Sequence, residues 1–569
     1  MSDKEESGGI RSYARNLTTR SQVNGYRFLL SRMEHAIVRR DIRMLHDPMR
    51  SQYRSLMVGM VLGVLVLAGC GIWAYFSPNR LIKQEQDTFI SGRDSGARYV
   101  MVNGKLHPVL NAVSAWLITG KKVAPVSVKE TELGKYSRGP LVGIVGAPDS
   151  IMGGTSTTKS EWSICDTTMV GIGSRTQQEN PPRSTKVPEY PEGSIELSIV
   201  EGQARGAVLP PDSAFLVAYN GKNYLVYGDG KRAEINLDPQ PNLGDEQRSR
   251  EQAAANNAVM SAYQLTEYRK QDITKQQHFP RQISDGLFNS LEELKPIVPP
   301  EIPHRGDPPP QALGVSNILV GTVVKSRSTT SNEDQFYVIE STGYQPITRA
   351  MADLIRNSSD QIGTDIKVLQ PSELNRLQIA HELDVDWYPP VPPKILDPKA
   401  SPVICYNWSK SRGEAQSKAR LFMGSKEPIP ANGDPVELAS ADGGETVDAQ
   451  GVHHNNGIDK VYVQPGTGFF AQGIGIAPNN EKHGSIFYVA DTGVRFGIQS
   501  LSDASALGLP ASSAGDGSVG LPVPWSILGK LPQGPTLSRA DALVELDSAV
   551  PANNPAPLYV PQQSGKQGG

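Results

Sequence analysis

Residues 56–76 read LMVGMVLGVLVLAGCGIWAYF and contain no charged side chain. An α-helix of about 21 residues rises by about 31 Å, which matches the hydrocarbon core of a bilayer. A core helix of a soluble protein would carry polar residues on one face. The apolar region of a cleaved signal peptide is usually shorter and lies nearer the start of the chain. The stretch therefore predicts a single retained membrane span over residues 55–76.

Charge is distributed unequally on the two sides of this span. Residues 1–54 contain one Lys and ten Arg, whereas residues 77–92 contain only Arg80 and Lys83 as cations. Cationic segments resist translocation, so we expect the N-terminal arm to stay in the cytoplasm and residues 77–569 to be exported.

The cytoplasmic arm contains the pattern of an amphipathic helix. Thr19-Arg-Ser-Gln22 has the form of a capping box at a helix start. An apolar face and a basic end follow, and Pro48 is expected to end or kink the helix. Such a helix can lie on the anionic inner leaflet, pack on a cytoplasmic partner, or only fix the topology, and the pattern leaves all three open. The candidate contact residues are Tyr26, Leu30, Met33, Ile37, Arg39, Arg40 and Arg43.

Composition narrows the class of the exported part. The chain has 569 residues and a formal net charge of −3, which gives no basic excess for binding nucleic acid. It contains 55 Gly and 44 Pro, a content that favours many turns and short strands over long helices.

A strand–turn–strand pattern recurs through the exported part. Each copy is a short apolar run, an Asn-Gly or Thr-Gly turn and a second run, and Asn-Gly is a strong hairpin signal because both residues tolerate positive φ. The four copies lie at residues 99–109, 215–226, 335–347 and 486–498.

Related features of the two halves of the exported part are offset by about 240 residues, with both exported cysteines among them. Only the second and fourth hairpins depart from this offset, which predicts one insertion in each half, within residues 236–280 and 425–483. The sequence thus predicts an α+β, β-rich domain of four hairpin repeats in two duplicated halves related by a pseudo-twofold axis.

The expected boundaries follow from this pattern. A linker covers residues 77–98, and a C-terminal tail, expected to be disordered, covers 546–569. The first half covers 99–330, with repeats at 99–133 and 214–291. The second half covers 331–545, with repeats at 335–374 and 484–531.

The chain has three cysteines. Cys70 lies within the span and reads as a small apolar residue. Cys165 and Cys405 occupy equivalent places in the two halves, and a pair of cysteines in an oxidising compartment suggests a disulfide across the axis. Two buried free thiols are the alternative.

The search for catalytic motifs finds no constellation. None of the Gly-Lys pairs is followed by Ser or Thr, as a phosphate-binding loop requires, and Gly-x-Ser-x-Gly is absent. His453-His454 lacks metalloprotease spacing and reads as a solvated loop. Asp491-Thr-Gly493 is like an aspartic protease triplet but occupies a predicted hairpin turn and has no second copy. We therefore predict no catalytic, cofactor-binding or metal-binding residues.

Several segments resemble the EccB family, a core membrane component of the mycobacterial type VII (ESX) secretion system. The resemblance covers nearly the whole chain and departs at residues 236–280, which read longer and more helical than expected. The segments that carry it are Leu17-Thr-Thr-Arg-Ser-Gln-Val-Asn-Gly-Tyr-Arg-Phe28, Arg32-Met-Glu-His-Ala-Ile-Val-Arg-Arg40, Asp94-Ser-Gly-Ala-Arg-Tyr-Val100, Leu106-His-Pro-Val-Leu-Asn111, Arg138-Gly-Pro-Leu-Val-Gly-Ile-Val-Gly-Ala-Pro148 and Leu531-Pro-Gln-Gly-Pro-Thr-Leu-Ser-Arg-Ala540.

This resemblance implies a structural subunit of an inner-membrane secretion channel, with a periplasmic domain. The implied partners are EccC, EccD and EccE on the membrane and cytoplasmic side, a mycosin protease outside, and further copies of the chain through the exported domain. Some family members are recorded as ATPases, so an ATP-hydrolysing subunit is one alternative. A cell-wall-binding module is another, because repeat-built β domains often present ligand-binding faces.

Overall fold

A computed structural model of the chain describes residues 19–40, 48–76, 87–153, 158–168, 195–202, 206–268, 280–311, 318–327, 334–358, 366–427, 429–430, 433–438, 446–447, 453–454, 457–475, 484–510 and 519–546. The chain divides into two compact units, Met1–Lys83 and Gln84–Gly569. Arg43 and nearly all of the expected tail lie outside the described residues.

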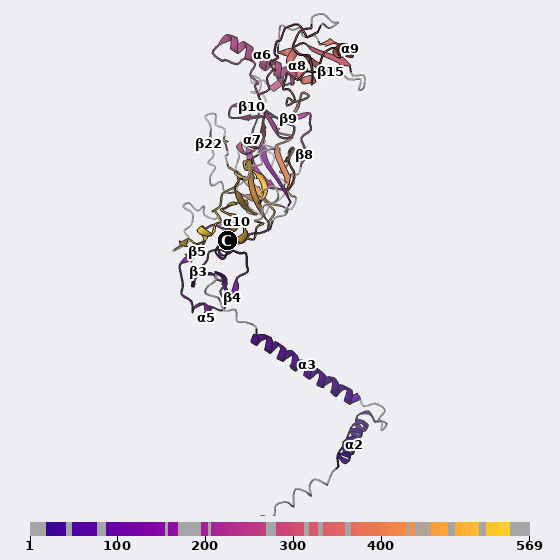
Figure 1. Ribbon diagram of the computed structural model, residues 1–569, viewed down its shortest axis with the longest axis vertical. Helices are drawn as coiled ribbons and strands as arrows, with labels where there is room; N and C mark the ends of the chain where they lie inside the picture. Colours follow the sequence, from indigo (N-terminus) through magenta and orange to yellow (C-terminus); the bar gives the residue numbers. More distant parts are fainter. Residues whose placement is uncertain are drawn as a thin grey trace, which may run out of the picture. The chain divides into compact units, whose positions relative to one another are not determined.

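The first unit begins with helix α2, Arg20–Arg39 (Figure 1). The Thr19 side chain accepts a hydrogen bond from the Gln22 backbone N–H, and the Gln22 side chain accepts one from the Thr19 backbone N–H. This reciprocal pair confirms the predicted capping box. The helix ends at Arg40, whose φ of 54° places it in the left-handed conformation of a C-cap.

Helix α3, Pro48–Phe76, contains the predicted span. Its Gln52–Trp73 segment is long and apolar enough to cross a membrane, with a mean hydropathy of 2.3, and none of it is buried. Pro48 was expected to end or kink the first helix, and this was wrong, because Pro48 is instead the first residue of α3. Proline suits a helix start, since its missing N–H would have no intrahelical acceptor there.

The second unit is built around a central sheet with strand order β21-β24-β7-β6-β19-β20-β8. Its middle strands β6 and β19 run antiparallel, with Cys165 directly opposite Cys405 and Trp162 opposite Trp408. The strands are β6 Lys159–Thr168, β7 Ile195–Glu201, β8 Ala207–Val208, β19 Val403–Ser411, β20 Lys418–Gly424, β21 Val436–Glu437 and β24 Lys460–Tyr462.

Four smaller sheets in the described residues share one strand order. Counted along the chain, their strands lie side by side in the order third, second, first, fourth, and the fourth strand is parallel to the first. The first is β1 Thr88–Gly92, β2 Arg98–Val102, β3 Lys105–Pro108 and β4 Val126–Val128. The second has these four strands as β9 Ser213–Tyr219, β10 Lys222–Tyr227, β11 Lys231–Ile235 and β12 Arg281–Gln282, and two further strands, β13 Glu292–Glu293 beside β11 and β18 Lys394–Ile395 beside β9. The third is β14 Val323–Arg327, β15 Asp334–Ile339, β16 Tyr344–Ile347 and β17 Lys367–Val368. The fourth is β25 Gly468–Ile474, β26 Ile486–Ala490, β27 Arg495–Ile498 and β28 Leu521–Pro524.

In each of these sheets one helix connects the third strand to the fourth, and a short helix follows the fourth strand. The connecting helices are α4 Ala112–Thr119, α6 Glu246–Ala262, α8 Arg349–Asn357 and α10 Leu501–Ala506. Their N-cap side chains all accept a backbone hydrogen bond, which fixes where each helix starts. The short helices are α5 Glu130–Leu133, α7 Asp285–Ser290, α9 Pro371–Leu374 and α11 Trp525–Leu528.

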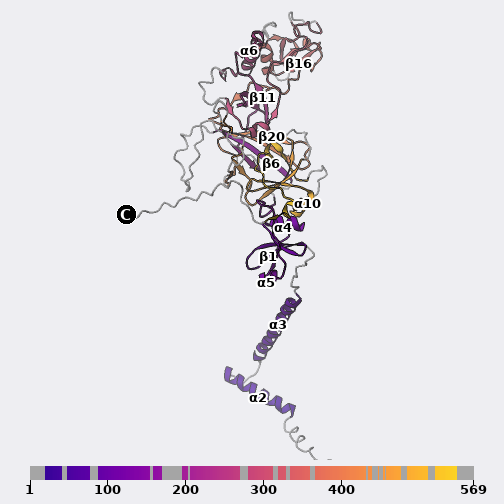
Figure 2. The same ribbon diagram turned by 90° about the vertical axis from the view of Figure 1, so that its left-hand side faces the viewer.

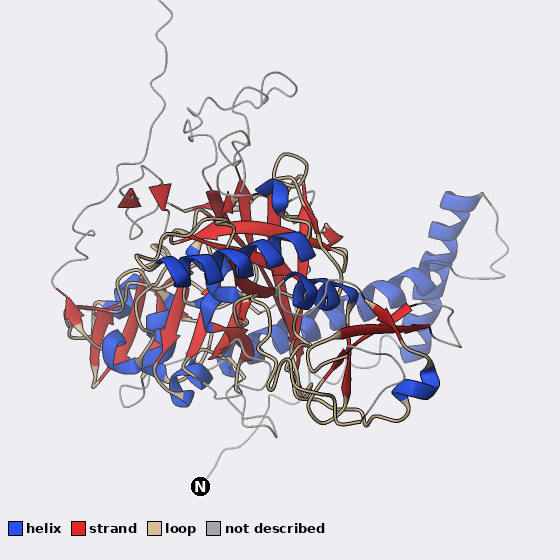
Figure 3. Ribbon diagram, turned by 90° about the horizontal axis from the view of Figure 1, so that it is seen from above, coloured by secondary structure: helices blue, strands red, loops and turns tan. Residues whose placement is uncertain are grey.

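After each short helix the chain returns and lies parallel to the third strand. The residue pairs that mark this return are Leu106 with Arg138, Arg232 with Glu293, Tyr344 with Ile379 and Arg495 with Gln533. The remaining described elements are β5 Leu141–Val142, η2 Thr266–Tyr268, β22 Thr446–Val447, β23 His453–His454, α12 Arg539–Ala542 and β29 Glu545–Leu546. Strands thus predominate in this unit, as Figure 3 shows.

Two expected boundaries differ from the strands of the structure. Strand β1 lies inside the expected linker 77–98, with Phe89 and Ile90 buried between β2 and β4. The boundary at residue 330 falls between the paired strands β14 and β15. The range 425–483, within which the second insertion is expected, also contains β25, the first strand of the fourth sheet.

The second hairpin has a different place in its sheet from the other three. All four predicted segments form antiparallel strand pairs, but Asn220-Gly221 joins a first strand to a second strand. The turn equivalent to those of the other copies joins β10 to β11 and contains Gly228 and Gly230, both with positive φ. This shift by one strand is part of why the second and fourth hairpins departed from the common offset.

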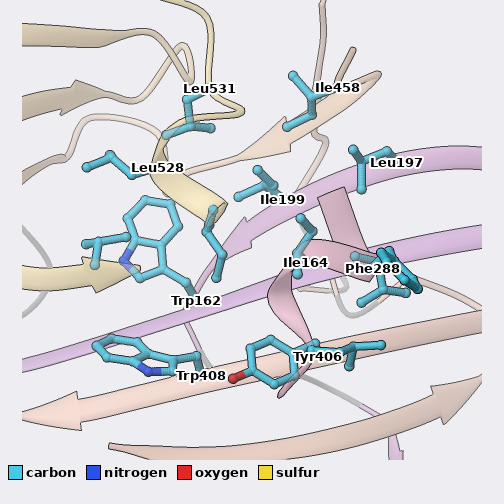
Figure 4. Close-up of a cluster of buried hydrophobic side chains, with 14 of the residues drawn as sticks. Trp162, Ile164, Leu197, Ile199, Phe288, Tyr406, Trp408, Ile458, Leu528 and Leu531 are labelled. Atoms are coloured by element: carbon cyan, nitrogen blue, oxygen red, sulfur yellow. The ribbon is translucent and has the colours of Figure 1, made fainter. Parts of the chain in front are cut away.

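The hydrophobic core joins elements that are far apart in the sequence. One cluster packs the first sheet against the fourth, another packs the second against the third, and a third cluster joins the central sheet to the second and fourth. Figure 2 shows α4 close to α10, and Figure 4 shows Trp162, Trp408 and Tyr406 in the central cluster. The two sequence halves are therefore interlocked within one compact unit.

Candidate assembly site

The span and the helix before it present apolar side chains without a partner in the described residues. Along α2, Tyr26, Leu30, Met33 and Ile37 are 44% to 78% exposed. The structure places these four residues and the backbone of Arg39 on this helix, and Arg40 at its end. Exposed apolar side chains at helical spacing are the type of surface that packs against another helix or a membrane.

The two exported cysteines form a disulfide in the middle of the central sheet. Their Cα atoms are 4.0 Å apart and the sequence separation is 240 residues. Both side chains are buried and pack with Val403 and Phe422. The bond therefore connects the two halves at the pair of strands where they meet.

A buried polar cluster lies beside the disulfide. The Asp166 carboxylate accepts hydrogen bonds from the backbone N–H and the hydroxyl of Ser284, at 2.7 and 2.6 Å. The buried Arg281 guanidinium donates to the Thr168 hydroxyl and to the carbonyls of Ser401 and Pro402. Burial raises the pKa of Asp166 to about 6, and the bonds from Ser284 and the charge of Arg281 only partly oppose this effect.

This cluster was missed in the sequence analysis. Its sequence signal is a charged residue directly after Cys165, in the middle of a predominantly buried strand, since a buried carboxylate needs partners from elsewhere in the fold. Because the partners lie more than a hundred residues away, the sequence alone does not identify them.

The residues considered for chemistry take structural roles where they are described. The Asp491 carboxylate accepts a hydrogen bond from the Gly466 backbone N–H at 2.9 Å, so it stabilises the loop before β25. His453 and His454 form β23, paired with β22. Among the described residues no group of three or more His, Cys, Asp or Glu side chains is placed to hold a metal ion.

Comparison with known proteins gives one consistent family. The family model for the type VII secretion system ESX-1, transport TM domain B (EccB) matches residues 15–551. The ESX-3 secretion system ATPase EccB3 of Mycobacterium tuberculosis strain H37Rv is 34% identical over 556 residues, covering 96% of this chain and 92% of the relative. The ESX-5 secretion system ATPase EccB5 of the same strain is 30% identical over 571 residues, covering 98% of this chain and 100% of the relative.

Two solved structures carry the same fold. A chain of an intact ESX-5 inner membrane complex matches with a TM-score of 0.65 and 28% identity, covering 96% of this chain and 99% of that one. A chain of an EccB3 dimer from the ESX-3 core complex matches with a TM-score of 0.62 and 32% identity, covering 80% of this chain and 100% of that one. The chain therefore belongs to the EccB family of type VII secretion components.

Proposed function

We propose that this chain is a structural and assembly subunit of a type VII secretion inner-membrane complex. The observation that carries the proposal is the likeness, over 96% of the chain, to a component of an intact ESX-5 inner membrane complex. In this role α3 anchors the subunit and the cationic arm stays in the cytoplasm. Residues 84–569 then lie on the periplasmic side, in line with their similarity to a chain of an ESX-5 periplasmic assembly.

The proposed partners follow from the family. On the cytoplasmic and membrane side, α2 and α3 contact EccC, EccD and EccE, with the exposed face of α2 as one contact surface. The periplasmic unit contacts a second copy of the chain, which the EccB3 dimer supports, and a mycosin protease.

We also infer that the periplasmic unit arose by internal duplication, with four repeats in two halves. The shared strand order and the parallel return after each short helix support this inference. So does the pairing of Cys165 with Cys405, since residues offset by 240 meet on a pseudo-twofold axis between β6 and β19.

ATP hydrolysis is the alternative suggested by the names of the relatives. Gly104-Lys105 and Gly221-Lys222 lie at hairpin turns, whereas a phosphate-binding loop connects a strand to a helix N-terminus. These positions favour the structural role. ATP turnover by the purified chain, free of EccC-like proteins and compared with a buffer control, tests the alternative directly.

Purification of the tagged full-length protein in mild detergent tests the assembly role. We expect co-purification of EccC-, EccD- and EccE-like proteins in a megadalton particle, read by native gel and mass spectrometry. A lone monomer or dimer under the same conditions would contradict the assembly role. Retention on a peptidoglycan pull-down would then favour a free-standing wall-binding module.

A further inference from the structure

A cleft lined by charged side chains lies between the second sheet and the central sheet. Its volume is about 800 Å³, within the range of small-molecule sites. One wall comes from the β10–β11 turn and β13, and the other from β19 and β20; Figure 2 labels β11 and β20. The lining includes Lys231, Arg232 and Glu293 on the first wall and Tyr406, Lys418 and Arg420 on the second.

Arg232 is the buried charged residue of this cleft. Its side chain is 8% exposed, and its guanidinium carbon lies 3.7 Å from the centroid of the Phe288 ring. Nη2 contacts the Glu293 carboxylate at 3.2 Å, while Nε is buried without a hydrogen-bond partner in the described part of the chain. The guanidinium is thus held in place by an aromatic ring and still has an N–H group, at Nε, without a partner among the residues described. Such a group is a preorganised site for a carboxylate.

Arg495 occupies the equivalent position in the fourth sheet and makes the contrast clear. Both arginines lie two residues after a glycine with positive φ and within the first two residues of the third strand of their sheet. Arg495, like Arg232, also packs over aromatic rings. Its Nε, however, donates to the Leu531 carbonyl at 3.0 Å and its Nη2 donates to the Gln533 side chain at 3.3 Å. At the same arginine position Nε is thus bonded by the protein in the fourth sheet and has no partner among the described residues in the second.

Cations are only slightly in excess around Arg232, because Asp229, Glu292 and Glu293 line the cleft together with Lys231, Lys418 and Arg420. Lys231 and Arg420 line the cleft and make no side-chain hydrogen bond or ion pair with any described residue, and Lys418 is paired with Glu414. Glu293 already places a carboxylate against Arg232, but its side chain is 70% exposed. Only the Glu293 side of this ion pair is exposed, and the buried Arg232 needs a carboxylate partner, so a ligand can displace Glu293 only by supplying a carboxylate in its place.

We propose that this cleft binds the carboxylate group of a small acidic or peptide ligand, with Arg232 as the anchor and Lys231 and Arg420 at the rim. Glu293 occupies the anchor in the free protein and swings out when the ligand carboxylate takes its place. None of the site's residues lies in the first unit, so the site is separate from the proposed contact face of α2. A free organic acid and the stem peptides of cell-wall polymer share this chemistry.

Isothermal titration calorimetry of the detergent-solubilised full-length protein with glutarate at low ionic strength tests the site. Glutaramide, which has the same shape without charge, is the matched ligand control. We expect glutarate to bind and glutaramide not to bind, with affinity at least tenfold lower in Arg232→Gln and about threefold lower in Arg420→Glu. Glu293→Gln should bind glutarate more tightly, because it removes the competing carboxylate.

Lys222→Gln removes a cation of the same sheet outside the cleft and should leave glutarate binding unchanged. If Arg232→Gln fails to fold, the exposed Arg420 and Glu293 variants still decide the question. Absence of glutarate binding, or equal binding by wild type, Arg420→Glu and Glu293→Gln, would overturn the proposal. Soluble peptidoglycan fragments released by a muramidase distinguish the two possible ligands. If the fragments compete with glutarate, the ligand is a stem peptide of the cell wall. If glutarate binds and the fragments do not compete, the ligand is a free organic acid.

Discussion

Cys165 and Cys405 lie directly opposite each other on β6 and β19, with their Cα atoms 4.0 Å apart and their sulfurs joined in a disulfide. The two strands belong to different halves of the chain, and each forms a further antiparallel pair with the strand that follows it, β7 or β20. The disulfide therefore links the halves at the central one of the strand pairs between them, which in this sheet also include β7 with β24 and β8 with β20.

Cys165→Ser should lower the stability of the periplasmic unit. In the chain-entropy model a closed loop of this length stabilises the fold by about 4–5 kcal/mol, less any strain. Calorimetry of the oxidised protein measures the change, and Cys70→Ser, at an exposed free cysteine of the span, is the control. An unchanged melting curve for Cys165→Ser under oxidising conditions would count against a stabilising disulfide.

Charge reversal at Arg39, Arg40 and Arg43 should weaken complex assembly or perturb topology. Glutamates at positions 39 and 40, at the end of α2, oppose the helix dipole, and the triple change removes cations that the proposed topology places in the cytoplasm. The measurement is the amount of EccC-, EccD- and EccE-like protein that co-purifies with the tagged variant. Lys121→Glu, an exposed residue of the second unit, controls for the change in charge. Normal recovery of the intact complex with the triple variant would contradict a role for this end of the helix.

The proposed orientation predicts opposite labelling of two engineered cysteines. In a Cys70→Ser background, a membrane-impermeant maleimide added to spheroplasts should label Lys121→Cys and leave Asn24→Cys unlabelled until the membrane is permeabilised. Both positions are exposed in the structure, so burial does not explain a difference. Labelling of Asn24→Cys before permeabilisation would reverse the topology.

The Asp166 carboxylate should make stability fall as the pH rises. Burial raises the folded-state pKa of Asp166 to about 6, above its ordinary value of 3.8, so the native state binds the proton more tightly than the unfolded state. The stabilisation by protonation is complete below the unfolded pKa and is lost as pH rises through about 6, by up to about 3 kcal/mol.

Asp166→Asn should therefore reduce the dependence of the urea midpoint on pH between about pH 4 and 7. The side-chain oxygen of the asparagine can still accept a hydrogen bond from the backbone N–H of Ser284, so the neutral variant keeps this bond to the N-cap residue of α7. Asp149→Asn, which removes a carboxylate that is 77% exposed, is the matched control. Equal pH profiles for wild type and Asp166→Asn would show that Asp166 does not titrate in this range.

Several parts of the molecule were predictable from local chemistry. The Thr19 and Gln22 side chains predicted the start of α2 because both bonds of a capping box form within four residues. The Asn103-Gly104 and Asn220-Gly221 turns were predictable because these residues accept the positive φ that a tight hairpin requires. The Asp166–Arg281 cluster and the Arg232 cleft were not, because each joins residues from distant elements.

The sequence by itself determined the apolar span, the capped helix, the hairpin turns and the candidate pairing of Cys165 with Cys405, because each depends on a continuous run, a local turn or a spacing along the chain. Only the tertiary structure decided which repeats share a core and where each small sheet begins. Strands such as β1, β4 and β12 are too short to form alone. Burial of apolar side chains stabilises any contact that excludes water, so it does not specify which strand each of them pairs with. Backbone pairing with other strands sets the position of each of these strands within its sheet. The buried side chains of the finished sheets then pack the first sheet on the fourth and the second on the third.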